Sequence, residues 1–251
     1  MSYTQEQLDM IIDLRKQGKG VTEIGRIMGV DRKSVSDNLK KLGLSTERNP
    51  IIKNIFHEID SEEKAYWLGM LYSDGSVNKT NGQVTLGLNE KDLLHLEKLK
   101  KFLQCNNKIS YSKKTKSYRL TFCCANITKD LKKLGCYPNK SLTLSFPSND
   151  QVPEHLKRHF MRGYIDGDGC LCFTDKTYCF SFTGTESFIN EAIKFFNWKS
   201  CKLDSAGQNK TWRCGDKKFV PVYLDTLYKD ASIYLDRKYE KYKQMSNVGA
   251  H

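Results

Sequence analysis

The 251-residue sequence lacks any apolar run near the ~20 residues that a membrane-spanning helix needs, so none is expected. Its first residues, MSYTQEQLD, contain neither a basic stretch nor an apolar segment, so we expect no signal or transit peptide. Acidic residues are also scarce, because 29 Asp and Glu stand against 41 Lys and Arg, a formal net charge of +12. This excess favours a polyanionic partner, and nucleic acid is the usual one.

The nine cysteines include no C-x-x-C pair, so the closely spaced ligands of a structural zinc site are missing. Their odd number and wide scatter indicate reduced thiols, and we therefore expect a cytoplasmic protein. Hydrophobic residues make up 39% of the chain and aromatic residues 11%, which predicts a folded protein with a packed core.

Residues 4–43 predict three short helices. Thr4 and Gln7 have the spacing of a capping box, Gly29 suits the end of a second helix, and Asp31 can cap a third helix at 32–41. This pattern is typical of a helix-turn-helix DNA-binding domain, which we place at residues 1–44. The expected small core comprises Ile24, Met28, Val30, Val35 and Leu39.

In a helix-turn-helix, the third helix enters the major groove and presents polar side chains to base edges. The expected DNA contacts from this helix are Arg32, Lys33, Ser34, Ser36 and Asn38. The segment itself has few excess positive charges, so an appendage that only packs on the rest of the protein stays an alternative. Residues 45–60 begin polar, contain Pro50 and show no clear period, and we interpret them as a linker.

Two apolar, helix-like segments recur in the remaining chain, AYWLGMLYSDG at 65–75 and FMRGYIDGDG at 160–169. In both, a glycine precedes an aspartate by five residues and the segment ends in Asp-Gly. The aspartates, Asp74 and Asp168, are 94 residues apart.

Further landmarks follow in the same order at similar offsets. Glu90 and Glu186 each precede a helical stretch and are 96 residues apart, and Lys140 and Lys238 are 98 apart. These offsets predict a duplicated unit of about 100 residues. We place repeat one at 61–147 and repeat two at 148–247, each with the order helix, two strands, helix, two strands, helix.

Each repeat also predicts a hairpin with basic residues. The first has strands at 108–112 and 117–122 around the turn 113–116, and the second has strands at 198–202 and 211–213 around a polar loop. Twisted β-ribbons fit the major groove, so these segments should supply DNA contacts. The expected residues are Lys108, Ser110, Ser112, Lys113, Lys114, Lys116, Arg119, Lys199, Lys202, Gln208, Asn209, Lys210 and Arg213.

The segments ending in Asp74-Gly75 and Asp168-Gly169 resemble the paired LAGLIDADG motifs of homing endonucleases, the enzymes of intron homing. The resemblance extends to PNKS at 138–141 and YLDRKY at 234–239, and it covers about residues 61–247. It implies a monomeric α/β (α+β) protein with pseudo-two-fold symmetry. In that fold the two motif helices lie side by side, and two antiparallel sheets form a saddle over double-stranded DNA.

The resemblance implies site-specific hydrolysis of phosphodiester bonds in double-stranded DNA. A carboxylate at a helix C-terminus is unfavourable unless a cation compensates it, and two together suit Mg²⁺ or Mn²⁺. By register with the family, the expected metal ligands are Asp74 and Asp168, the residues that orient water or metal are Glu90 and Glu186, and the basic residues near the scissile phosphate are Lys140 and Lys238. Gly69 and Gly163 should let the motif helices approach closely.

The two motifs differ at two positions. Tyr72 stands where the second motif has Asp166, and Arg162 stands where the first has Leu68, so we expect Arg162 to face solvent or the linker. Two alternative functions stay open: a non-cleaving DNA-binding transcription regulator with this fold, and a maturase that binds intron RNA. Glu90 and Glu186 have an alternative as helix-start acids stabilised by the dipole, and Lys238 as part of a solvated charged face. The presence of both motif aspartates counts against the regulator.

Overall fold

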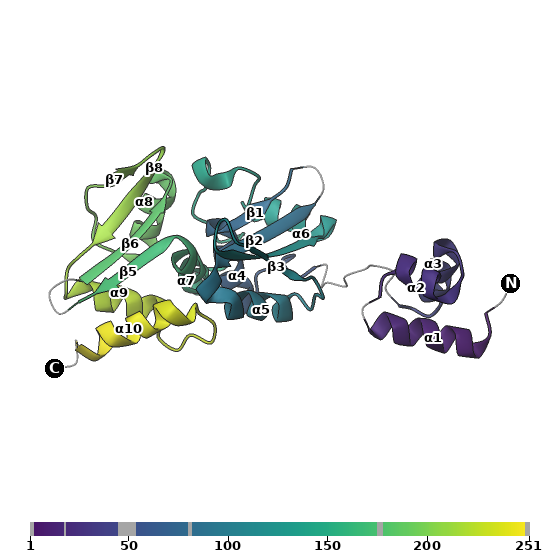
Figure 1. Ribbon diagram of the computed structural model, residues 1–251. Helices are drawn as coiled ribbons and strands as arrows, with labels where there is room; N and C mark the ends of the chain where they lie inside the picture. The colour runs from purple at the N-terminus through teal and green to yellow at the C-terminus, as the bar shows by residue number, and fades with distance from the viewer. Residues whose placement is uncertain (1–2, 18, 45–53, 80–81, 175–177, 249–251) are drawn as a thin grey trace. The chain divides into compact units, whose positions relative to one another are not determined.

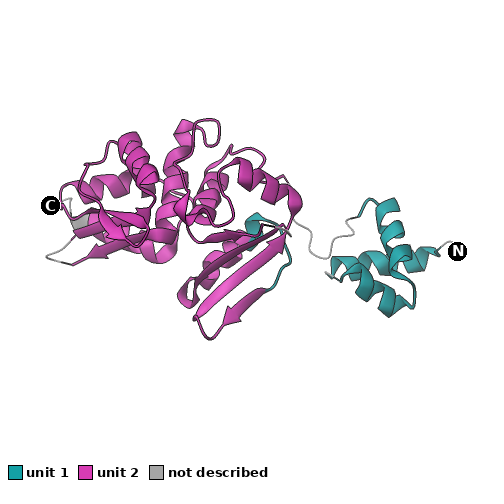
Figure 2. Ribbon diagram, turned by 90° about the horizontal axis from the view of Figure 1, so that it is seen from above, with its two compact units in different colours: residues 1–52, 100–108 teal, residues 53–99, 109–251 magenta. Residues whose placement is uncertain are grey.

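The computed structural model describes residues 3–17, 19–44, 54–79, 82–174 and 178–248. The chain divides into two compact units, residues 1–52 with 100–108 and residues 53–99 with 109–251 (Figure 2). No helix in the described part of the chain is both long and apolar enough to cross a membrane.

The N-terminal part of the first unit consists of three helices, α1 (Gln5–Lys16), α2 (Val21–Met28) and α3 (Arg32–Lys41) (Figure 1). Their predicted end signals are confirmed. Thr4 forms the capping box with Gln7, Gly29 ends α2 in the left-handed conformation with φ of 68°, and the Asp31 side chain accepts a hydrogen bond from the Ser34 amide at 2.9 Å.

The core of these three helices contains the expected residues together with Ile11. Ile11, Ile24, Val35 and Leu39 are fully buried, and the expected core residues Met28 and Val30 are only partly buried against them. The turn after α2 crosses that helix closely, because a Cβ on Gly25 would lie 2.7 Å from the Val30 carbonyl oxygen. A side chain at this position would therefore push the turn away from α2.

The described chain from α4 onward shows the predicted order of helices and strands twice. In repeat one the elements are α4 (Glu62–Ser73), β1 (Gly75–Val77), β2 (Gln83–Asn89), α5 (Leu93–Phe102), β3 (Ile109–Ser112), β4 (Ser117–Cys123) and α6 (Ala125–Lys133). In repeat two they are α7 (Lys157–Asp168), β5 (Gly169–Phe173), β6 (Tyr178–Gly184), α8 (Glu186–Phe196), β7 (Asp204–Ala206), β8 (Asn209–Cys214) and α9 (Phe219–Tyr228), followed by α10 (Asp236–Val248). Short 3₁₀ helices lie at Glu90–Asp92 (η1), Lys140–Leu142 (η2) and Glu154–Leu156 (η3).

Each repeat forms a four-stranded antiparallel sheet with the same topology, β1-β2-β4-β3 in the first and β5-β6-β8-β7 in the second. The registers correspond, because Gly75 pairs with Leu86 and Gly169 pairs with Phe182. Side chains alternate between the two faces of each strand, so Val84 and Leu86 are buried on one face of β2 while the residues on its other face are half-buried or exposed. The predicted duplicated fold with two antiparallel sheets is confirmed.

The motif helices α4 and α7 pack against each other between the two sheets (Figure 1). They are buried on almost all sides, as their apolar sequences predict. At their crossing, a Cβ on Gly69 would lie 2.8 Å from the Tyr164 amide nitrogen, and a Cβ on Gly163 would lie 2.9 Å from the Tyr66 carbonyl carbon. Side chains at these two positions would meet the main chain of the facing helix, in keeping with the predicted close approach.

Three structural predictions need correction. The strand predicted at 198–202 is wrong, because the Trp198 amide bonds the Ile193 carbonyl and finishes α8, and β7 begins only at Asp204. Lys202 therefore lies in coil before β7, whereas Asn209 and Lys210, expected in a loop, lie on β8. Arg162 does not face solvent, because its side chain is fully buried among hydrogen-bond partners.

The predicted linker at 45–60 overlaps the described chain only in part. Residues 45–53 lie outside the described residues. In the second half, Ile55, Phe56 and Ile59 are buried, so the packed core of the second unit begins before the predicted residue 61.

Candidate active site

Asp74 and Asp168 occupy equivalent places at the C-termini of the paired helices. Asp74 is the residue that caps α4, and Asp168 is the last residue of α7. Each is followed at once by a glycine that begins a strand, β1 or β5. Gly167 brings the two ends together, because a Cβ on this glycine would lie 2.9 Å from Asp74 Oδ2.

Both carboxylates are accessible to solvent, yet the protein around them still removes part of their hydration. This desolvation, together with the nearby charge of Asp168, raises the pKa of Asp74 to about 6. Desolvation also raises the pKa of Asp168, and the positive charges of Lys140 and Lys238 oppose that rise. The two aspartates thus form an interacting pair of like charges at neighbouring helix ends.

Two buried lysines lie beside this pair in equivalent positions. The Lys140 ammonium donates to the carbonyl of Gly75, and the Lys238 ammonium donates to the carbonyl of Gly169 at 2.6 Å. Lys238 also donates to the carbonyls of Ile165 at 2.6 Å and Asp166 at 2.9 Å, so it caps the C-terminus of α7. Burial lowers the pKa of Lys238 to about 8.

The donor set suits a hard divalent cation. Among the described residues, no group of three or more His, Cys, Asp or Glu side chains could hold a metal ion. Mg²⁺ is commonly bound by one or two carboxylates, with waters and substrate phosphates as the remaining ligands. Asp74 and Asp168 fit that pattern, and the desolvation that raises both pKa values disfavours their charged forms unless a cation compensates them.

Glu90 and Glu186 are exposed and lie farther along the chain from the aspartates. Glu90 begins η1 directly after β2, and Glu186 begins α8 two residues after the end of β6. Each is four residues beyond the strand residue that pairs with the motif glycine. Glu90 accepts a hydrogen bond from the Tyr111 hydroxyl at 2.6 Å. Glu186 is the first residue of α8, after the N-cap Thr185, where the helix dipole stabilises a negative charge, so its alternative role as a helix-start acid is retained.

The expected DNA contacts fall partly on the exposed faces of the two sheets. In the first sheet, Ser110 pairs with Arg119, and Ser112 lies on the same face because it is two residues farther along β3. In the second sheet, Arg213 pairs with Ser181 and its side chain is exposed. The three lysines of the β3–β4 turn are exposed, as predicted: Lys113, Lys114 and Lys116.

The remaining expected contacts are more scattered. The exposed residues in coil or turns are Lys108, Lys199, Lys202 and Gln208. Asn209 shares the strand face of Arg213, whereas Lys210 shares the face of the buried Trp212 and so points away from Arg213.

On α3 of the first unit, Arg32 and Lys33 are exposed and Ser36 is half-buried. Two other expected contacts already have partners, because the Ser34 hydroxyl donates to the Tyr3 hydroxyl at 2.9 Å and the Asn38 amide donates to the Ser34 carbonyl at 2.9 Å. The exposed side chains at the start of α3 are thus its two basic residues.

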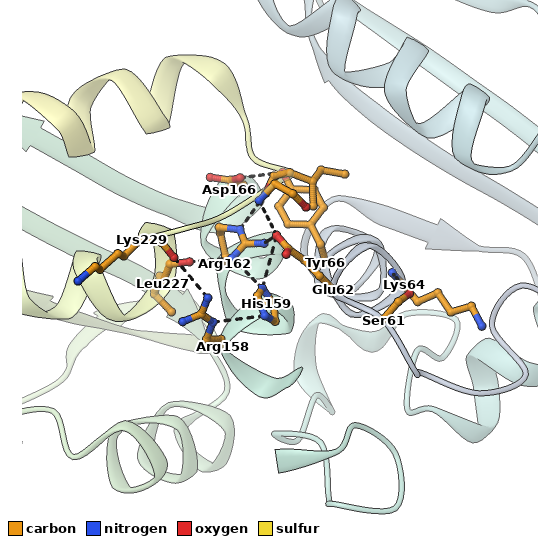
Figure 3. A network of polar contacts seen from close by, with 12 residues as sticks. Ser61, Glu62, Lys64, Tyr66, Arg158, His159, Arg162, Asp166, Leu227 and Lys229 are labelled. Carbon is orange, nitrogen blue, oxygen red and sulfur yellow. Dashed lines mark hydrogen bonds and ion pairs between the residues drawn. The ribbon is translucent and has the colours of Figure 1, made fainter. Parts of the chain in front are cut away.

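Sequence reasoning missed a buried polar network beside the site (Figure 3). Arg162 donates to the carbonyls of Leu227 at 2.7 Å and Ile233 at 2.8 Å, and to Glu62 Oε1 at 2.6 Å. A charged residue inside an apolar helix must find partners, and that signal could have indicated burial rather than exposure. Gly167 was also missed, although its motif offers a small residue next to the aspartate.

No family model matches this chain, and no curated protein matches its sequence. Solved structures do match its fold. The LAGLIDADG meganuclease I-AabMI bound to uncleaved DNA is 14% identical with a TM-score of 0.52, over 74% of this chain and 89% of that one. I-SmaMI bound to uncleaveable DNA is 12% identical with a TM-score of 0.53, over 76% and 91%. The I-LtrWI LAGLIDADG homing endonuclease bound to target DNA is 13% identical with a TM-score of 0.52, over 75% and 90%.

Proposed function

We propose that this chain, which has the LAGLIDADG fold, is a divalent-metal-dependent endonuclease that cuts double-stranded DNA at specific sites. The observation that carries the proposal is the pair of accessible carboxylates, Asp74 and Asp168, at neighbouring helix C-termini. Each has a buried lysine beside it. The similar solved structures are bound to DNA, which supports DNA as the partner.

Asp74 and Asp168 would hold Mg²⁺ or Mn²⁺. Such ions, when bound, activate water and stabilise the charge that develops on a phosphate. The ammonium groups of Lys140 and Lys238 offset the negative ends of the helix dipoles. They would also stabilise negative charge on a phosphate bound there. One aspartate and one lysine from each repeat match one cleavage event on each DNA strand.

Site selection would come from the exposed sheet faces and from the N-terminal helices. Arg119 and Arg213 lie on strands whose exposed faces could enter a groove, and the turn lysines would contact phosphates. We assign residues 1–44 to a helix-turn-helix that reads neighbouring DNA and residues 61–247 to a monomeric endonuclease domain. We assign to Glu90 and Glu186 the orientation of water or metal.

The test is incubation of the full chain with a randomised duplex library and Mg²⁺, followed by sequencing of the cut ends. A single enriched site, cut on both strands and protected by a chelator, is the expected result. Asp74→Asn and Asp168→Asn should abolish or cripple double-strand cutting while binding persists. Asp150→Asn, an exposed carboxylate in a turn, is the control.

Full cutting by the double variant Asp74→Asn, Asp168→Asn would overturn the assignment of the site. Specific DNA binding by the unmodified protein without any cutting would favour the transcription regulator. Preferential binding of structured RNA over duplex DNA would favour the maturase.

A further inference from the structure

The position two residues before the motif aspartate has different chemistry in the two repeats. Asp166 occupies it in α7 and Tyr72 in α4, and both side chains are buried. Asp166 accepts three hydrogen bonds, from the hydroxyls of Tyr228 at 2.6 Å and Tyr66 at 2.7 Å, and from the Leu235 amide at 2.7 Å. Its carboxylate thus binds α4, α9 and the segment before α10.

A closed ring of hydrogen bonds joins Asp166 to Lys238. The Asp166 carboxylate accepts from the Leu235 amide, and the Leu235 carbonyl accepts from the Lys238 amide at 2.9 Å. The Lys238 ammonium then returns to the Asp166 carbonyl at 2.9 Å. The ring therefore links the Asp166 side chain, through the main chain at Leu235, to the segment that carries Lys238, whose ammonium itself donates, among the described residues, only to main-chain carbonyls of α7 and Gly169.

The buried network of Figure 3 fixes the rest of the same segment. Arg162 binds the carbonyls of Leu227 and Ile233, at the end of α9 and just before Leu235. Glu62 from α4 accepts from Arg162 and from the Ser232 amide at 2.8 Å. The segment between α9 and α10, which leads directly to Lys238, is therefore held at several main-chain atoms by charged side chains of the two motif helices.

Repeat one holds its lysine less firmly. The Tyr72 hydroxyl donates to the Leu134 carbonyl at the end of α6, six residues before Lys140. The Cys136 thiol adds a weak contact with the Leu71 carbonyl at 3.5 Å. A single hydroxyl thus stands where repeat two has a carboxylate with three donors, and no ring of the kind above closes on Tyr72 within the described part of the chain.

We propose that Asp166 is a positioning residue that fixes the Lys238 ammonium at the C-terminus of α7, and that Tyr72 is its weaker counterpart for Lys140. This inference rests on the proposed function of the site. It predicts that the two halves of the site respond separately to substitution, and that each substitution affects mainly one DNA strand.

The first measurement needs no cleavage. The free protein is acylated with an N-hydroxysuccinimide ester, and the rate at each lysine is read by mass spectrometry. In Asp166→Ala, acylation of Lys238 should rise at least fivefold while that of Lys140 stays unchanged. Asp166→Asn, whose amide oxygen can still accept from the Leu235 amide, should restore most of the protection, and Tyr72→Phe should raise acylation at Lys140 only.

The second measurement resolves cleavage by strand, on the site found with the library. Asp166→Ala should slow one strand at least tenfold more than the other, so that nicked DNA accumulates, with little change in affinity. Tyr72→Phe should slow the opposite strand, by a smaller factor. Tyr178→Phe, a buried tyrosine of β6 outside this network, is the matched control.

If Asp166→Ala does not fold, the cause would be the buried donors that it leaves without an acceptor. In that case Tyr228→Phe, which removes only one of the donors to Asp166, replaces it. Unchanged acylation of Lys238 in the folded variants, or equal slowing of both strands, would overturn the inference. If the unmodified protein cuts no DNA, the proposed function fails, whereas the acylation experiment still tests the positioning of Lys238.

Discussion

Gly163 lies where the main chains of α4 and α7 nearly touch, so it offers a test at the scale of a single residue. In Gly163→Ala the added Cβ would meet the Tyr66 carbonyl group, which is main chain and cannot move aside alone. We expect a net loss of roughly 1–3 kcal/mol in the free energy of unfolding, since overpacking outweighs the better helix propensity of alanine.

Urea denaturation provides the measurement for Gly163→Ala. The matched control is Gly87→Ala, whose added Cβ would make ordinary contact with the Arg119 side chain at 3.4 Å. Equal midpoints for Gly163→Ala and the unmodified protein would contradict this prediction, because they would show that α4 and α7 can move apart without a loss of stability.

The pKa of Asp74 gives a pH-dependent prediction. The native state raises this pKa from 3.8 to about 6, so it binds the proton more tightly than the unfolded chain does. Stability should therefore fall as the pH rises from about 4 through about 6, and the penalty should persist above that range. Asp74→Asn should raise the melting temperature at pH 8 in the presence of a chelator, with an advantage that shrinks toward pH 4. The same pH dependence in both proteins would contradict the shift.

If the proposed function holds, Lys140 and Lys238 should act on the rate of cleavage more than on DNA affinity. A group beside the scissile phosphate contributes mainly in the transition state, so Lys140→Met and Lys238→Met should slow cleavage with little change in the dissociation constant. Single-turnover cleavage and a separate binding titration measure the two effects. Equal losses in both would identify these lysines as ordinary phosphate contacts.

At the scale of elements, the β3–β4 hairpin separates two kinds of basic residue. Lys113, Lys114 and Lys116 lie in its turn, and Arg119 lies on the exposed face of β4. Changing the turn lysines to Ala should weaken binding to all duplexes alike. It should also flatten the salt dependence by ~0.9 of a unit of slope for each phosphate that the variant no longer neutralises.

Changing Arg119 to Ala should instead relax preference at particular base pairs. Binding titrations at several salt concentrations, with specific and unrelated duplexes, distinguish the two outcomes. A uniform loss for Arg119→Ala would place it among the residues that bind phosphate.

At the scale of the whole molecule, the question is whether the N-terminal helices contribute to DNA binding beside the second unit. If residues 1–44 read DNA beside the cleavage site, their deletion should shorten the footprint and weaken binding, by roughly 1–3 kcal/mol for each base-reading side chain removed. Cleavage at the central site should persist, because both aspartates lie in the second unit. Nuclease protection of the full and shortened chains is the measurement, and an unchanged footprint would favour the packing appendage.

The sequence by itself determined the features that depend on local pattern. The caps of Thr4 and Asp31, the αL glycine Gly29 and the two glycine-containing motif helices follow from short-range hydrogen bonding and periodicity, which a linear pattern records directly. The duplication also followed from the sequence, because the aspartate, glutamate and lysine pairs keep similar spacing even where the residues between them differ.

Only the tertiary structure decided which buried polar groups meet. Arg162 binds Glu62, a hundred residues earlier in the chain, and the carbonyl of Leu227, 65 residues later. No local sequence pattern encodes such partners. Lys238 likewise reaches the helix end only because the segment after α9 folds back along α7.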